Sequence, residues 1–352
     1  ARLDKLDRIQ VGPESAGSEP GPAAYGLGGT RPTVTDADVG MGRIVAETFA
    51  GGAFQLDMDA SRSALEQDIG KPLDLDVDAS AFGVSEVVDE NMAAAARAHA
   101  AEFGMDLAQR DMVAFGGAAP LHAARLGDKL GVDRIVIPTN AGVGSAVGFL
   151  LAPVSYEVVR SRHQDLAGFD AATINVLMEE MRAEAEAVVR QGAEGAELTE
   201  LRQAYMRYKG QGHEIAVDLP VEVYGDGHAD VFRRAFEAVY ERLYGRCIDG
   251  VGIEVLSWTL SISAPAPDSS EEPAKTGKKR PAPEAHETQS MFDSSLEKRI
   301  EVPVYLRGQL MPGDRISGPA LITEDQTTTV VASNYTAMIN AWGYIVLMRD
   351  ST

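Results

Sequence analysis

The sequence predicts an α/β fold, followed by an α+β region and a β-rich carboxyl-terminal region. Three observations carry this prediction: helical and strand patterns alternate over residues 85–151, amphipathic helices flank a hairpin pattern over residues 171–262, and short apolar strands recur after residue 298. The predicted boundaries are 1–153 for the α/β part, 154–264 for the α+β region, 265–297 for a linker or long loop, and 298–352 for the β-rich region.

Glycine and proline are concentrated between residues 12 and 52, which predicts turns and short elements. A flexible linker is the alternative. It is disfavoured because apolar and aromatic side chains are interleaved here, namely Tyr25, Val34, Met41 and Phe49. We therefore expect an ordered loop region.

The α/β part reads as helix, strand, helix, strand and small-residue helix. An Ala-rich helix is predicted over residues 85–103, with Gly104 where a C-cap belongs, and a second helix over 121–130 closed by Gly131. Strands are predicted over 111–115 and 134–138. This order argues for a parallel α/β layer.

The later regions have different patterns. Apolar periodicity predicts helices over 171–191, ending near Gly192, and over 231–244. Alternation predicts a hairpin of 201–208 with 214–219, and a strand over 253–262. Prolines and charges predict an exposed segment over 265–297, and the remaining predicted strands are 302–306, 320–322, 327–332 and 344–348.

Composition excludes several function classes. The chain has 352 residues with 32 Lys+Arg against 53 Asp+Glu, a net charge of −21, which argues against nucleic acid or an anionic membrane as partner. The single cysteine, Cys247, excludes an internal disulfide and a multi-cysteine metal site. No signal peptide or membrane span is predicted, so we expect a cytoplasmic protein. The first residue is Ala1 rather than Met, which predicts a processed, split or truncated chain.

The junction of Phe115, Gly116, Gly117 and Ala118 is the strongest local candidate for a binding site. Two glycines at the end of a strand let a ligand approach the backbone, and the following helix offers free N–H groups. The alternative is a tight turn without a ligand. A second glycine series, Gly142, Gly144 and Gly148, departs from the dinucleotide spacing and favours close helix packing.

Polar candidates are few. The six histidines are dispersed and none has zinc-site spacing, so we predict no metal site built by the protein. His122 and His213 are more typical of packed or exposed histidines than of catalysts. Asp36 has two interpretations, an oxygen ligand for Mg²⁺ or the N-cap of the next helix.

Several segments together resemble the hydantoinase A/5-oxoprolinase family, which includes the nucleotide-binding subunits of acetone and acetophenone carboxylases. They occur in the family's order over nearly the whole chain. The matching segments are residues 11–17, 20–26, 32–37, 113–123, 137–148, 207–211 and 318–322.

The resemblance implies part of an actin-like (ribonuclease H-like) ATPase core, followed by the α+β and β regions. It implies that ATP and Mg²⁺ serve to phosphorylate a carbonyl oxygen, after which a cyclic amide is opened or a ketone is carboxylated. Phe115, Gly116, Gly117 and Ala118 would then lie beside the nucleotide, and Gly28, Gly29 and Asp36 near the active cleft. No catalytic residue is assigned.

The chain departs from the family in lacking both glycine-threonine phosphate-binding segments, and in having Ala24 and Ala119 where Cys and Gly are usual. We therefore expect the carboxyl-terminal part or a split subunit of an ATP-dependent enzyme that opens a hydantoin, 5-oxoproline or lactam. It would act with a missing amino-terminal lobe or a larger subunit of the hydantoinase B type. The alternatives are a ketone carboxylase subunit and a non-catalytic assembly module.

Overall fold

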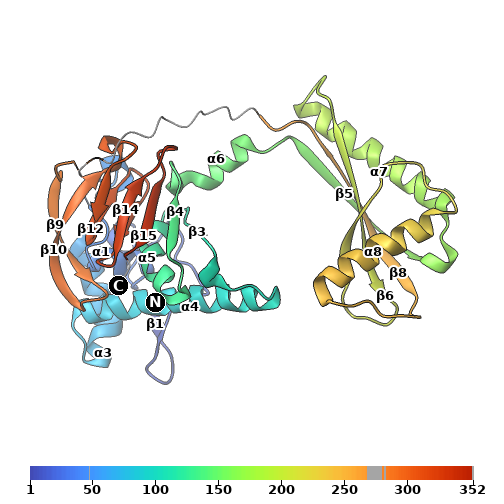
Figure 1. Ribbon diagram of the computed structural model, residues 1–352. Helices are drawn as coiled ribbons and strands as arrows, with labels where there is room; N and C mark the ends of the chain where they lie inside the picture. Colours follow the sequence, from blue (N-terminus) through green and yellow to red (C-terminus); the bar gives the residue numbers. More distant parts are fainter. Residues whose placement is uncertain (47, 268–279, 281–282, 351–352) are drawn as a thin grey trace. The chain divides into compact units, whose positions relative to one another are not determined.

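The computed structural model describes all residues except 47, 268–279, 281–282 and 351–352. The chain forms two compact units, each described here by itself (Figure 1). Unit 1 comprises Ala1–Gly148 and Glu271–Thr352, and unit 2 comprises Phe149–Ser270. Within the described residues, no helix is both long and apolar enough to cross a membrane.

A five-stranded sheet of unit 1 joins distant parts of the chain. Its order is β11-β14-β15-β4-β3, with β3 (Met112–Val113), β4 (Arg134–Ile137), β11 (Arg315–Ser317), β14 (Tyr335–Ile339) and β15 (Ile345–Arg349). The predicted parallel pair is present as β3 and β4. Antiparallel β15 extends it, with Ile345 opposite Ile137 and Leu347 opposite Ile135. The carboxyl-terminal strands therefore complete this sheet, and the expectation of a separate β-rich region does not hold here.

A second sheet of unit 1 has four strands in the order β13-β12-β10-β9. These strands are β9 (Glu287–Asp293), β10 (Lys298–Leu306), β12 (Ala320–Thr323) and β13 (Thr328–Val331). Strand β9 lies within residues 265–297, the segment expected to be a linker or long loop. The sequence did not predict this strand because its polar and apolar residues alternate too weakly. The rest of that expectation falls largely on residues 268–279, which lie outside the described part. The short strands β1 (Arg2–Leu3) and β2 (Ile9–Gln10) pair separately.

Some helices of unit 1 begin or end at recognisable capping signals. Helix α5 ends at Leu130 with Gly131 in the left-handed conformation, as predicted, and α4 begins earlier than predicted because Asp76 caps it. The helices are α1 (Val34–Gly40), α2 (Met58–Leu65), α3 (Lys71–Leu73), α4 (Val77–Glu102) and α5 (Ala119–Leu130), and α6 (Gly144–Leu151) spans the boundary between the units. The segment 12–52, apart from residue 47, is ordered loop with short elements, as predicted.

Unit 2 is a four-stranded antiparallel sheet in the order β5-β8-β6-β7, with two helices against one face. Its elements are β5 (Ser155–Asp165), α7 (Ala171–Gly192), β6 (Thr199–Tyr208), β7 (Ile215–Leu219), α8 (His228–Tyr244) and β8 (Ile253–Ser263). The predicted hairpin is confirmed as β6 and β7. Strand β5 was not predicted because most of its side chains are exposed and polar. The core between sheet and helices contains Trp258, whose indole N–H donates to the Arg162 carbonyl at 2.9 Å.

Gly42 is required where the chain leaves α1 and passes β9. Its φ is +74°, and a Cβ there would lie 2.2 Å from the Ser290 carbonyl oxygen. We expect Gly42→Ala to lower the free energy of unfolding by about 3 kcal/mol, because the left-handed conformation costs ~1 kcal/mol and the clash adds to it. Urea denaturation of the full chain measures this.

Gly104→Ala is the matched control for Gly42→Ala. Gly104 also has a positive φ, +61°, but no atom lies within 4 Å of the Cβ position. We expect a loss of only ~1 kcal/mol for this variant. Equal losses for the two variants would contradict the assigned contact between Gly42 and β9.

Candidate functional site

The double-glycine turn, formed by Phe115, Gly116, Gly117 and Ala118, connects β3 to α5. The Gly116 N–H donates to the Ala141 carbonyl at 2.7 Å, and the Thr327 hydroxyl donates to the Gly117 carbonyl at 2.8 Å. The turn is thus held from two sides, by the residues preceding α6 and by the loop between β12 and β13.

The second glycine series packs against the same region. A Cβ on Gly142 would lie 2.4 Å from the Gln326 Cβ, and one on Gly144 would lie 3.2 Å from the Phe115 ring. Gly142 and Gly144 are therefore needed for close approach to a loop and to the turn, whereas no atom lies within 4 Å of the Cβ position of Gly148, so the packing interpretation holds for only two of the three glycines.

The outer side of the double-glycine turn is open. Gly116 has φ +110° with no atom within 4 Å of its Cβ position, and Phe115 is 53% exposed. In the described residues, the N–H groups of Gly117 and Ala118 donate to no other protein group. Free N–H groups and an open backbone at the start of a twelve-residue helix fit a nucleotide or another anionic ligand.

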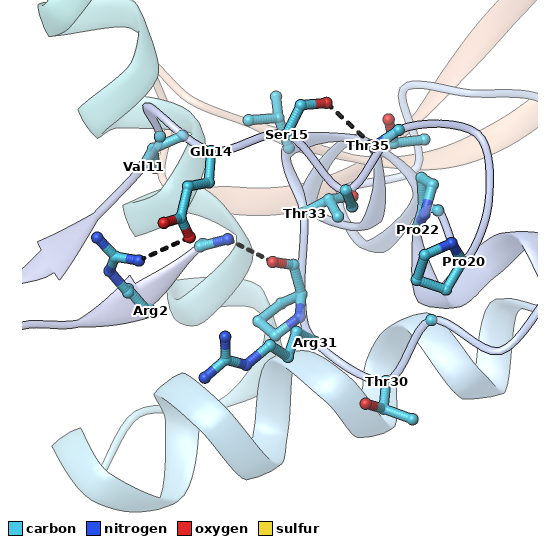
Figure 2. A pocket seen from close by; sticks show the side chains of 18 of the residues that line it. Arg2, Val11, Glu14, Ser15, Pro20, Pro22, Thr30, Arg31, Thr33 and Thr35 are labelled. Atoms are coloured by element: carbon cyan, nitrogen blue, oxygen red, sulfur yellow. Dashed lines mark hydrogen bonds and ion pairs between the residues drawn. The ribbon is translucent and has the colours of Figure 1, made fainter.

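Gly28 and Gly29 line a different cavity. This pocket has a volume of about 620 Å³ and lies between the loop of residues 12–17 and the segment of residues 28–35, which ends in the first turn of α1 (Figure 2). Gly29 cannot be replaced without moving backbone, because a Cβ there would meet the Gly21 carbonyl oxygen at 2.1 Å, whereas Gly28, with φ +101°, has only Pro20 nearby. We refer to this cavity as the glycine-loop pocket.

Asp36 is completely buried beneath this pocket-lining segment. One carboxylate oxygen accepts from the Ala24 N–H at 2.8 Å, and the other accepts from the Ala23 N–H at 3.1 Å and from the Thr33 N–H and hydroxyl at 2.8 Å each. The N-cap of α1 is Thr33, with Asp36 at the third helical position, so the N-cap assignment of Asp36 was wrong by three residues. Its carboxylate oxygens are committed to local donors, which does not fit a role as a Mg²⁺ ligand.

His122 lies on α5, one turn after the double-glycine turn, in a buried network of charges. Its Nδ1 is 2.8 Å from a carboxylate oxygen of Asp89 on α4, and its Nε2 is 3.1 Å from one of Asp38 on α1. The Arg43 guanidinium donates to Asp38 at 3.1 Å, to the Ser85 hydroxyl at 2.8 Å and to the Ser294 hydroxyl at 2.9 Å. We call these residues the His122 network.

Electrostatics favours the protonated imidazole in this network. Burial alone would lower the pKa of His122, but the Asp38 and Asp89 carboxylates outweigh burial and raise it to about 9. The pKa of Asp38 is lowered, because His122 and Arg43 together outweigh the burial that would raise it. Two carboxylates then face two cations, and the network is neutral overall.

A further acidic group, Glu324, lies in the loop between β12 and β13 that contacts the turn through Thr327. Glu324 lies two residues before Gln326, and one of its carboxylate oxygens is buried without a partner in the part of the chain that is described. Burial raises the pKa of Glu324 above its usual range, while the charge of Arg307 acts in the opposite direction. The sequence offered no signal for this residue.

The predicted site residues thus fall into two groups. Gly28, Gly29 and Asp36 belong to the glycine-loop pocket and its support, whereas the double-glycine turn lies against Ala141 and Thr327. No hydrogen bond between described residues joins the groups directly. The His122 network links them through the helices, since Asp38 follows Asp36 on α1 and His122 lies on α5, which begins directly after Ala118. Neither Asp38 nor Asp89 was predicted.

Comparison with known proteins decides the family. The hydantoinase/oxoprolinase family model matches residues 1–158, and the model of the hydantoinase/oxoprolinase C-terminal domain matches residues 163–349. The chain belongs to the hydantoinase/oxoprolinase family. Within the described residues, no group of three or more His, Cys, Asp or Glu side chains is arranged to hold a metal ion.

The names of relatives of this chain refer to different reactions. The caprolactamase subunit alpha of Pseudomonas jessenii is 28% identical over 94% of this chain and 48% of its own length. The acetone carboxylase beta subunit of Xanthobacter autotrophicus is 27% identical over 95% of this chain and 48% of its own length. The crystal structure of the ATP-dependent caprolactamase from Pseudomonas jessenii superposes with a TM-score of 0.78 at 26% identity, covering 100% of this chain and 51% of that chain. The chain therefore spans about half the length of these relatives.

Proposed function

We propose that this chain is the carboxyl-terminal part or a split subunit of an ATP-dependent enzyme that activates a carbonyl by phosphorylation and opens a cyclic amide. The observation that carries the proposal is the family match over residues 1–158 and 163–349, together with the open double-glycine turn inside the first of these segments. Residues 1–153 would contribute to an actin-like lobe, and the proposed location is the cytoplasm.

The double-glycine turn is the proposed contact of this chain with ATP. The free N–H groups of Gly117 and Ala118, and the absence of a side chain at Gly116, support this assignment. ATP would supply the phosphoryl group. Gly28 and Gly29 would lie near the cleft, and Asp36 would act through the backbone it holds rather than by touching a ligand.

Mg²⁺ belongs to this proposal as the companion of ATP. The described residues do not assemble a set of ligands for it, and Asp36 does not fit that role, so no step is assigned to the metal. Any protein ligands would come from the proposed partner.

The proposed partner is the missing amino-terminal lobe or a larger subunit. Family relatives about twice as long as this chain support it, since the names of two of them are those of subunits. A nucleotide bound between two lobes needs both, and this chain lacks the glycine-threonine phosphate-binding segments. We therefore expect full activity only in the assembled protein.

Isothermal titration with ATP and Mg²⁺ tests the proposal. The chain alone should bind weakly, and the chain mixed with its amino-terminal partner should bind at least about tenfold more tightly, a difference of ~1.4 kcal/mol. Absence of binding in the reconstituted mixture would overturn the proposal and favour a non-catalytic assembly module.

A ketone carboxylase subunit is the second candidate. It is favoured by the acetone carboxylase relative, whose identity of 27% is close to the 28% of the caprolactamase relative. The two reactions share the activation of a carbonyl and differ in the second reactant. Dependence of ATP turnover on bicarbonate separates them.

A further inference from the structure

Several residues that line the glycine-loop pocket have free backbone N–H groups in the described part of the chain. Ser15 and Ala16 on one loop, and Thr30 and Arg31 on the other, line it, and in the described residues their backbone N–H groups donate to no other protein group. A volume of about 620 Å³ is within the range of small-molecule sites. The pocket therefore has room for a ligand and unused donors on both walls.

A cationic side chain also lies at the pocket. Arg31 is exposed, and none of the ion pairs or hydrogen bonds between described residues involves its guanidinium. Figure 2 shows Arg31 extending beside the pocket without a partner, whereas Arg2 pairs with Glu14 at 3.3 Å. In a chain of net charge −21, this leaves one cation, Arg31, beside free N–H donors at the pocket.

The Asp36 carboxylate is buried beneath the pocket, and its negative charge acts on the amino group of Ala1, which also lines the pocket. The Asp36 carboxylate oxygens accept hydrogen bonds from Ala23, Ala24 and Thr33, so they are turned toward the supporting backbone. Glu14 is the acidic side chain among the pocket-lining residues, and Arg2 already compensates it.

We propose that the glycine-loop pocket binds an oxyanion group, a carboxylate or a phosphoryl group, of the small-molecule substrate or its activated form. Arg31 supplies the cation, and the N–H groups of residues 15, 16, 30 and 31 supply further donors. This inference rests on the proposed function, because that function gives the pocket its substrate. It assigns to the chain a preference for cyclic amides that carry an acidic group.

Equilibrium binding to the full chain without ATP tests this inference. The probes are 5-oxoproline, a cyclic amide with a carboxylate, its neutral counterpart 2-pyrrolidone, and inorganic phosphate. We expect 5-oxoproline to bind at least about tenfold more tightly than 2-pyrrolidone. Arg31→Gln should weaken that binding by about tenfold, because the charge-assisted hydrogen bond is lost. Arg110→Gln, which removes another exposed arginine of unit 1, should leave it unchanged.

Each outcome of the titration decides the proposal. Binding of phosphate alone, weakened by Arg31→Gln, supports the oxyanion site and identifies the phosphoryl group as its source. Equal affinity for 5-oxoproline and 2-pyrrolidone without phosphate binding, no binding of any probe, or an equal effect of Arg31→Gln and Arg110→Gln would overturn it. Because ATP is absent, a failure of ATP-dependent turnover would leave this result unaffected, so the two proposals fail separately.

Discussion

Replacing His122 by glutamine is expected to lower the free energy of unfolding by about 3–5 kcal/mol, the usual cost of breaking a buried ion pair by removing one partner. His122, Asp38 and Asp89 are each at most 4% exposed, so water cannot compensate the carboxylates once the imidazolium is gone. One oxygen of Asp89 already lacks a partner among the described residues. Denaturant unfolding of the full chain measures the loss.

The control is His99→Gln on α4. The His99 side chain is 73% exposed and that of its partner Glu102 is 74% exposed. The His99 Nδ1 lies 3.7 Å from a carboxylate oxygen of Glu102. Exposed pairs of this kind contribute ~0–1 kcal/mol. If His122→Gln and His99→Gln unfold at the same denaturant concentration, the His122 network does not stabilise unit 1.

The pH dependence of the free energy of unfolding is a second measurement that tests the His122 network. The pKa of His122 is about 9 in the folded chain against 6.5 for an ordinary histidine. A raised folded-state pKa means that the stabilisation is fully present below pH 6.5 and is lost as the pH rises through 9, by about 3 kcal/mol at most. His122→Gln should remove this dependence, and its persistence in the variant would show that another group titrates.

Gly117→Val is expected to weaken ATP binding of the reconstituted protein by about hundredfold, or ~2.7 kcal/mol. A Cβ on Gly117 would lie 3.6 Å from the Gln326 carbonyl oxygen, which is an ordinary van der Waals contact. The fold can therefore accommodate the Cβ of the valine. The branched side chain would instead fill the space where the proposed ligand approaches the backbone. Isothermal titration measures the affinity.

Gly308→Val provides the control for Gly117→Val. Gly308 also has ordinary backbone geometry, and no atom lies within 4 Å of its Cβ position. We expect unchanged ATP affinity for this variant and similar thermal unfolding for both. Wild-type affinity in a folded Gly117→Val protein would show that ATP does not approach this turn.

Much of the fold could be predicted from local sequence patterns, because single helices and hairpins are determined mainly by residues that are close in sequence. Helix α5 follows from its apolar face and Gly131, and the β6–β7 hairpin from alternation across a glycine-containing turn. Pairings between distant segments were not visible. The contact of β15 with β4 joins Ile345 to Ile137, and no local pattern of either strand specifies the other.

The candidate site divides in the same way. The double-glycine turn follows from its sequence, because a strand, two glycines and a helix form a local unit. The partners of His122 lie 33 and 84 residues away, on α4 and α1. An aspartate on a helix gives no local signal that it will be buried against a histidine. The His122 network could therefore be identified only from the structure.

Substrate-dependent ATP turnover of the chain with its amino-terminal partner tests the central proposal most directly. We predict that a cyclic amide, offered as hydantoin, 5-oxoproline or a lactam, accelerates phosphate release from ATP and is converted to its ring-opened product without bicarbonate. Turnover that requires a ketone and bicarbonate, with no response to any cyclic amide, would contradict the proposed amide opening and assign the chain to a carboxylase.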